Sequence, residues 1–202
     1  MRLQKVGGAY LDKFPEALSK SAKDFIQIVY PQIQNWFKKG KLVEVQAVTN
    51  SEMSILLDQL AGIDAWYIET NKGIRGLASR VQYEGNYQTF TVRKERETGA
   101  RTEFEKLKYA INNNCVYPYW FCQAYLKYGQ IQSVALCKTV DLINYIEQGK
   151  EWKDYVILTA SKFGRSTFFA VSWQKFAEKG YFIKTIPERV TLQTLCYLEV
   201  KD

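Results

Sequence analysis

The fold is decided by GIDAWYI at residues 62–68 and by IRGLASRVQY at residues 74–83. Both segments are rich in β-branched and aromatic residues and are bounded by glycine or asparagine, which predicts two strands joined by a short turn. QTFTVRK at residues 88–94 predicts a third strand, and short turns between successive strands indicate an antiparallel meander. Alternation along the second strand places Arg80 and Gln82 on one face and Leu77 and Val81 on the core face.

Helical patterns flank these strands. Thr49-x-x-Glu52 and Thr102-x-x-Glu105 are capping boxes, and each precedes apolar residues at helical spacing. Residues 15–39 also have helical spacing, and Pro31 is expected to split or kink that helix. Further strands are expected at 120–126, 133–137, 155–159, 167–171 and 192–200, and short helices at 139–148 and 173–178.

The composition predicts a folded, basic protein. Its 202 residues are 47% hydrophobic and 15% aromatic, which is enough for a real core. Lysine and arginine number 28 against 21 acidic residues, and the resulting charge of +7 favours a polyanionic partner, with DNA first. Residues 1–14 contain no apolar signal core and no segment is long enough to span a bilayer, so we expect a cytoplasmic protein without a membrane partner.

The absence of histidine excludes several kinds of chemistry. Ser-His-Asp and Cys-His catalysis, histidine-ligated zinc and histidine pH switches all need a side chain that this chain lacks. None of the four cysteines forms a C-x-x-C pair, which argues against a zinc site. Cys122, Cys137 and Cys196 lie in apolar segments and are interpreted as buried thiols.

The order of elements from residue 49 to residue 137 resembles the PD-(D/E)XK, or restriction-endonuclease-like, nuclease superfamily. That order is helix, three strands, helix, two strands, and Gly62-Ile63-Asp64 with Val81-Gln82 is similar to the Gly-Ile-Asp … Val-Gln-x-Lys signature of its Mrr-like branch. The resemblance implies an α/β (α+β) fold with a mixed central sheet flanked by helices. It divides the chain into an N-terminal helical region (1–48), a nuclease-like core (49–150) and a C-terminal β-rich extension (151–202).

The resemblance also implies a Mg²⁺- or Mn²⁺-dependent DNA endonuclease that can act as a homodimer. In the family the Asp and the Glu of E-x-K bind a hard cation that polarises the phosphate and activates water, and the Lys faces that water. Asp64 matches the family Asp. Glu52, with Asp58 second, is the candidate acid on the preceding helix.

The E-x-K pair has two possible registers in this chain. Arg80-x-Gln82 lacks a metal-binding carboxylate, whereas Gln82-x-Glu84 puts an acid where a cation belongs. Asp64, Arg80 and Gln82 are the predicted catalytic residues, and Asp64, Glu52 and Gln82 are the predicted metal ligands. The missing cation would come from Arg93 or Lys106.

Six basic residues are candidates for contacting the phosphate backbone of DNA: Arg93, Lys94, Arg96, Arg101, Lys162 and Arg165. The first four are interleaved with glutamates, which is equally typical of a mixed, solvated surface. The departure from E-x-K leaves two alternatives to an endonuclease, namely a catalytically inactive nucleic-acid-binding protein on the same scaffold, or a protein-interaction subunit. In a plainer reading, Asp64 is a turn residue and Glu52 only completes its capping box.

Overall fold

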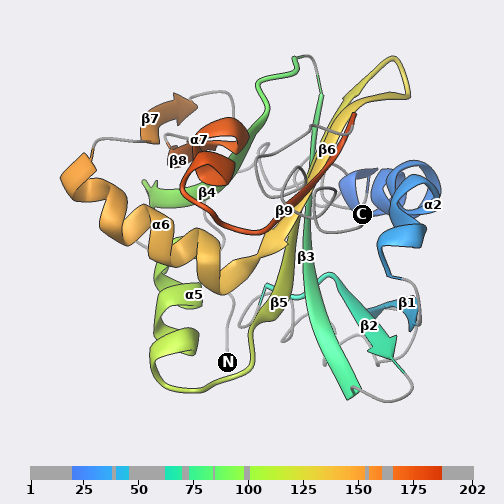
Figure 1. Cartoon of the computed structure of the whole chain (residues 1–202), viewed down its shortest axis with the longest axis horizontal. Helices are drawn as coiled ribbons and strands as arrows, with labels where there is room; N and C mark the ends of the chain where they lie inside the picture. The colour runs from blue at the N-terminus through green and yellow to red at the C-terminus, as the bar shows by residue number, and fades with distance from the viewer. Residues whose placement is uncertain are drawn as a thin grey trace, which may run out of the picture.

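The computed structural model describes residues 20–37, 40–45, 62–69, 73–83, 85–97, 101–152, 155–160 and 166–187. The fold is mixed α/β and rich in strands (Figure 1). Its elements in chain order are η1 (Phe25–Val29), α2 (Tyr30–Ile33), η2 (Gln34–Trp36), β1 (Gly40–Glu44), β2 (Ala65–Glu69), β3 (Gly73–Tyr83), β4 (Thr89–Arg96), α5 (Glu103–Asn112), β5 (Pro118–Lys127), β6 (Gln130–Lys138), α6 (Thr139–Trp152), β7 (Tyr155–Ala160), β8 (Ser166–Ser172), α7 (Trp173–Glu178) and β9 (Ile183–Ile186).

The main sheet has six strands in the order β1-β2-β3-β5-β6-β9. The first three are antiparallel, as the short turn between β2 and β3 predicts. β3 and β5 are parallel, and α5 belongs to the long connection that a parallel pair requires. β1 and β9, which come from the first and last of the three predicted regions, both join this sheet.

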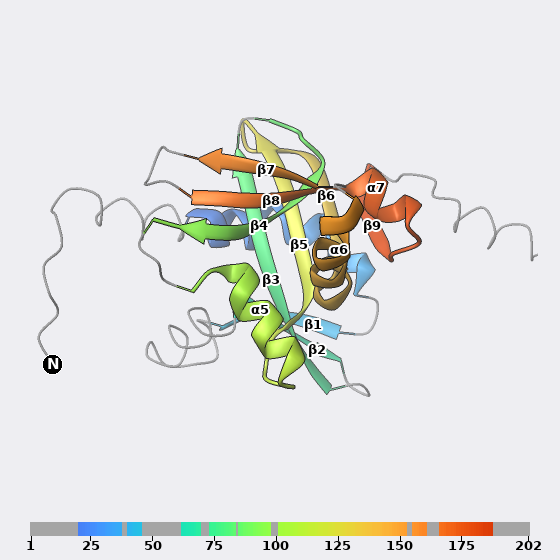
Figure 2. The ribbon, with the colours of Figure 1, turned by 90° about the vertical axis from the view of Figure 1, so that its left-hand side faces the viewer.

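The prediction that residues 88–94 continue the meander is wrong. β4 pairs with β8 in a second sheet of order β4-β8-β7, not with β3. The reason is geometric, because β2 and β5 already occupy both edges of β3. Figure 2 shows the second sheet lying across one face of the main sheet, on the same side as α5 and α6.

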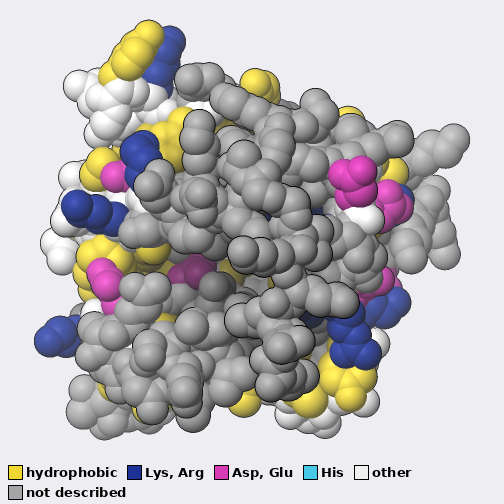
Figure 3. Space-filling model, turned by 180° about the vertical axis from the view of Figure 1, so that it is seen from behind, with side chains coloured by type: hydrophobic (Ala, Val, Ile, Leu, Met, Phe, Trp, Pro, Cys, Tyr) yellow, Lys and Arg dark blue, Asp and Glu magenta, His cyan; other side chains and the backbone are white. Residues whose placement is uncertain are grey.

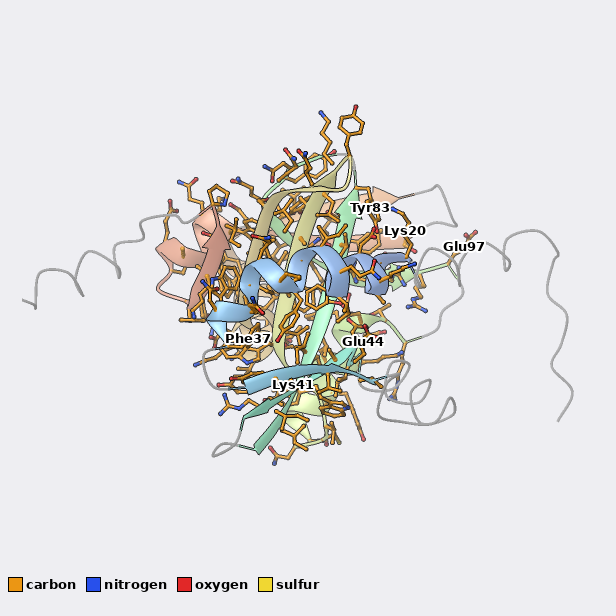
Figure 4. All side chains as sticks on the ribbon, turned by 90° about the vertical axis from the view of Figure 1, so that its right-hand side faces the viewer. Lys20, Phe37, Lys41, Glu44, Tyr83 and Glu97 are labelled. Atoms are coloured by element: carbon orange, nitrogen blue, oxygen red, sulfur yellow. The ribbon has the colours of Figure 1, made fainter. Side chains whose placement is uncertain are left out.

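The main sheet separates two hydrophobic cores. On one face, Leu77 and Val81 of β3 pack with Phe25 and Val29 of the N-terminal helical segment. On the other face, Ala78 of β3 packs with residues of β4, β8, α5, α6 and α7. Figure 4 shows the helical segment crossing its own face of the sheet, with Lys20 beside Tyr83. Both faces of β3 are therefore covered, and odd and even positions of this strand face different layers.

The local signals explain most of these elements. The Thr102 hydroxyl accepts a hydrogen bond from the Glu105 backbone N–H, and the Glu105 carboxylate accepts one from the Thr102 backbone N–H, so the predicted capping box is present. Helical backbone runs from residue 20 through Pro31. The turn before Pro31 is a π-helix, in which Tyr30 N–H reaches the Phe25 carbonyl. The helix thus accommodates the missing N–H of Pro31 with a wider turn and does not break there.

Some predictions fall outside the described residues, namely the helix that Thr49 and Glu52 would cap, Cys196 and the strand at 192–200. Cys122 and Cys137 are buried free thiols, as expected. In the part of the chain that the structure describes, no helix is long and apolar enough to cross a membrane.

Candidate functional site

Asp64 lies immediately before β2, and its carboxylate accepts hydrogen bonds from β3. Oδ2 of Asp64 accepts hydrogen bonds from the Ser79 backbone N–H at 2.5 Å and from the Ser79 hydroxyl at 3.1 Å. The Asp64 backbone N–H donates to the Leu77 carbonyl, and its carbonyl accepts from Val45 N–H. These bonds join β1, β2 and β3, so Asp64 has a structural role that its place in the sequence did not reveal.

Asp64 and Gln82 are not brought together. Ser79 shares its face of β3 with Leu77 and Val81, which pack against the N-terminal helical segment. Arg80 and Gln82 point to the opposite layer. There Arg80 pairs with Glu103 of α5 and the Gln82 amide donates to the Thr91 hydroxyl of β4.

This geometry does not fit a shared Mg²⁺ site. Three residues of strand separate Ser79 from Gln82 by about 10 Å. Two oxygens on one Mg²⁺ lie within about 4 Å of each other, because each Mg–O bond is about 2.1 Å. The residues that share the Ser79 face in the E-x-K spacing are Ser79 and Val81, which offer neither a carboxylate nor a cation. Among the described residues, no group of three or more acidic or cysteine side chains is placed to hold a metal ion. Glu52 lies outside them, so a metal site that includes it stays a prediction.

Arg80 instead belongs to a cluster between the two sheets. Oε2 of Glu103 accepts hydrogen bonds from Nη2 of Arg80 at 2.5 Å and from the Arg93 backbone N–H at 3.0 Å. The guanidinium groups of Arg80 and Arg93 lie over the Phe168 ring, with Cζ at 5.6 and 5.3 Å from its centroid. One carboxylate and one ring thus hold two arginines that come from different sheets.

A β-bulge in β4 adds Arg96 to this group. Arg93 pairs with Phe168, Glu95 with Thr167 and Arg96 with Ser166, so Lys94 is an extra residue without a partner on β8. Paired residues in a sheet share a face, and Phe168 and Ser166 are two positions apart on the same strand. The bulge therefore turns Arg93 and Arg96 to one face and Glu95 to the other. The Thr167 hydroxyl donates to Glu95 on that other face.

The arginine cluster, by which we mean Arg80, Arg93 and Arg96, carries more positive charge than its surroundings neutralise. Burial, then the nearby charge of Arg80, then that of Arg96, lower the pKa of Arg93 to about 10, and Glu103 opposes this shift. Nε of Arg93 and Nε of Arg96 are buried and have no hydrogen-bond partner among the described residues. Such buried donors cost about 1–3 kcal/mol each when nothing pairs with them, which makes the cluster a candidate site for an added acceptor.

A third unpaired donor lies in the same layer. Gln123 of β5 is fully buried and is the register partner of Arg80. Its Oε1 accepts from the backbone N–H and the hydroxyl of Thr91, at 3.3 and 3.1 Å. Its Nε2 is buried and has no hydrogen-bond partner in the structure. The region between the two sheets thus contains three N–H donors, two from arginine and one from glutamine, that bond to no described protein group.

Lys94 and Arg101, two of the other predicted phosphate-contacting residues, make contacts of their own. Lys94 pairs with Glu95 at 2.8 Å, and exposed Arg101 stacks over Tyr109 at 5.3 Å. Lys162 and Arg165 lie outside the described residues. Where described side chains are visible on the face shown in Figure 3, cationic and acidic groups are interspersed. Those visible groups form a mixed surface, whereas the arginine cluster lies between the two sheets.

Comparison with protein-family models, with curated proteins and with solved structures finds no match.

Sequence reasoning did not assign three members of the site to it: Thr91, Glu103 and Gln123. Glu103 lies in the first turn of α5, where a negative charge is favourable whatever else it contacts, so its sequence position gave no separate signal. Gln123 did carry a signal, because it is the one strongly polar side chain in the apolar segment 120–126. A buried glutamine in such a strand needs partners from another layer.

We predict that Asp64→Ala destabilises the fold without affecting any response to metal. Loss of the carboxylate leaves two Ser79 donors without their acceptor, so the free energy of unfolding should fall by about 1–3 kcal/mol. Asp64→Asn keeps an acceptor oxygen and should lose less. Urea unfolding measures both variants, with Mg²⁺ or with EDTA. Stabilisation of the wild type by Mg²⁺ that Asp64→Ala abolishes would contradict the structural role.

We also predict that Arg93→Gln stabilises the fold at pH 7. Because the folded-state pKa of Arg93 lies below that of an unfolded arginine, the folded chain binds this proton more weakly and the charge opposes folding. That opposition is complete below pH 10 and decreases gradually above it, towards the usual pKa of arginine, so the difference between wild type and variant should begin to narrow at pH 10.5. Urea unfolding at pH 7 and pH 10.5 tests this, with Arg75→Gln as the control for charge. If Arg93→Gln has a lower free energy of unfolding than the wild type at pH 7, groups in the fold already neutralise the charge of Arg93.

Proposed function

We propose that the protein binds nucleic acid through its phosphates and that the arginine cluster is the contact. The observation that carries the proposal is the pair of buried, unpartnered Nε–H groups of Arg93 and Arg96 beside a third arginine. Arginine presents its N–H groups in a planar fork that matches two phosphate oxygens. The net charge of +7 and the pI near 9.1 favour a nucleic acid over a small anion as the source of that phosphate.

The cluster is also held ready for a ligand. Glu103 and Phe168 fix Arg80 and Arg93 in place, so little side-chain entropy is lost when an anion binds. Arg80 retains 23% of its side-chain exposure and Glu103 24%, which leaves the cluster an edge open to solvent. In this proposal the scaffold is of the restriction-endonuclease-like type, and the mixed sheet with helices on both faces supports it. Binding does not require the E-x-K residues that the chain lacks.

Mg²⁺-dependent DNA cleavage is the second candidate, and the position of Asp64 at the start of β2 beside β3 favours it. Separation of Asp64 from Gln82 and the Ser79-x-Val81 pair on its face argue against it. We expect no cleavage of plasmid or single-stranded DNA in Mg²⁺ or Mn²⁺ beyond that of a mock purification. Cleavage by the wild type that Asp64→Asn abolishes would reverse the order of the two candidates.

For binding, we predict that Arg93→Gln weakens DNA affinity by about tenfold, the usual effect of losing one charge-assisted contact. The slope of log affinity against log salt should become shallower by about one, because one fewer counterion is released. Fluorescence anisotropy with a labelled oligonucleotide at several salt concentrations measures both quantities.

Arg75→Gln is the matched control for this experiment. It removes the same charge as Arg93→Gln but from β3, where Arg75 stacks on Tyr119 and lies on the opposite face from Arg80. Its affinity for DNA should stay within about twofold of the wild type, since a distant surface charge is screened by salt. Equal loss in both variants would show that binding follows net charge and not the cluster.

A further inference from the structure

We infer that the arginine cluster receives a terminal phosphomonoester, the phosphate at the end of a nucleic-acid strand, and not an internal phosphate of the backbone. This inference rests on the proposed function and names the part of the nucleic acid that enters the site. Three observations support it: the burial of the unpaired N–H donors, the net positive charge of the cluster and the fixed positions of the arginine side chains.

The unpaired donor atoms are buried between the two sheets and do not lie on the protein surface. Nε of Arg93, Nε of Arg96 and Nε2 of Gln123 are all buried, and Gln123 itself is fully buried. An internal phosphate is attached to sugars on both sides, so it meets a protein along an open surface. A terminal phosphate is attached on one side only and extends beyond the strand, so its oxygens can reach donors set back from the surface.

The charge of the cluster also fits a terminal phosphate. Among the described residues whose charges shift the pKa of Arg93, Arg80 and Arg96 are cationic and Glu103 is acidic, so these groups together with Arg93 carry two net positive charges. An internal phosphodiester carries one negative charge, whereas a phosphomonoester carries about −1.5 to −2 at pH 7. A phosphomonoester also has three free oxygens, and each can accept from more than one N–H group. The terminal group therefore neutralises the cluster more completely than an internal one.

The architecture holds these donors apart at fixed positions. Arg80 comes from the main sheet, and Arg93 and Arg96 come from the second sheet. The Phe168 ring lies beneath the first two guanidinium groups, and the bulge at Lys94 turns the third toward them. A phosphate bound here would contact both sheets at once, with one strand end for each protein molecule.

The experiment compares oligonucleotides of one sequence with an internal fluorophore, carrying a 5′-phosphate, a 3′-phosphate or hydroxyl groups at both ends. We expect wild-type protein to bind one phosphorylated form at least about tenfold more tightly than the hydroxyl form. The 5′ and 3′ arms identify which end is recognised. Arg96→Gln should reduce that preference to about one, whereas Arg75→Gln should preserve it. Arg96→Lys keeps the charge but removes Nε, so it should also lose most of the preference.

The outcomes separate this inference from the proposed function. If all three oligonucleotides bind equally well and Arg93→Gln weakens them equally, the strand-end inference is wrong and the proposed function stands. If none of them binds at low salt, the proposed function itself fails. If a free mononucleotide competes as well as the phosphorylated strand does, the ligand is a nucleotide and the strand-end inference is wrong. The oligonucleotide with hydroxyl groups at both ends serves as the control without a terminal phosphate.

Discussion

The candidate site depends on one extra residue in β4. Without the bulge at Lys94, strict alternation would place Glu95 on the face of Arg93 and turn Arg96 away. The carboxylate of Glu95 would then lie next to the guanidinium group it is now separated from, and the cluster would lose both a cation and its excess charge. The bulge thus places Arg93 and Arg96 on one face of β4 and Glu95, which pairs with Lys94, on the other.

The start of α5 is the second constraint. The capping box uses Thr102 and Glu105 for the first turn of the helix, so the side chain of Glu103 is available for other contacts. It reaches Arg80 on the main sheet and the Arg93 backbone on the second sheet. A single carboxylate therefore links three elements, α5, β3 and β4. This link positions the two sheets relative to each other and the two guanidinium groups over Phe168.

Much of the secondary structure could be predicted from the sequence, because its signals are local. The capping box of α5, the buried stripes of α5 and α6 and the alternation on β3 each depend on a few neighbouring residues. The partner of β4 could not be predicted in the same way. The pairing of β3 with β5 joins residues about forty positions apart, and it fills the edge of β3 that a hairpin with β4 would need. The site followed the same rule: Asp64 and Gln82 were candidates by spacing, but the two faces of β3 separate them.

Satisfaction of hydrogen bonds distinguishes a structural polar group from one that awaits a ligand. Asp64 has acceptor bonds from both donors of Ser79, so its burial is explained by the fold alone. Arg93 and Arg96 keep buried N–H groups without partners, and burial and like charges lower the pKa of Arg93. A layer shaped only for stability would replace such groups with apolar side chains of similar volume, because uncompensated buried cations oppose folding. In the proposal that the cluster binds phosphate, the free energy lost there becomes available when the anion binds, whereas the bonds of Asp64 leave nothing comparable to gain.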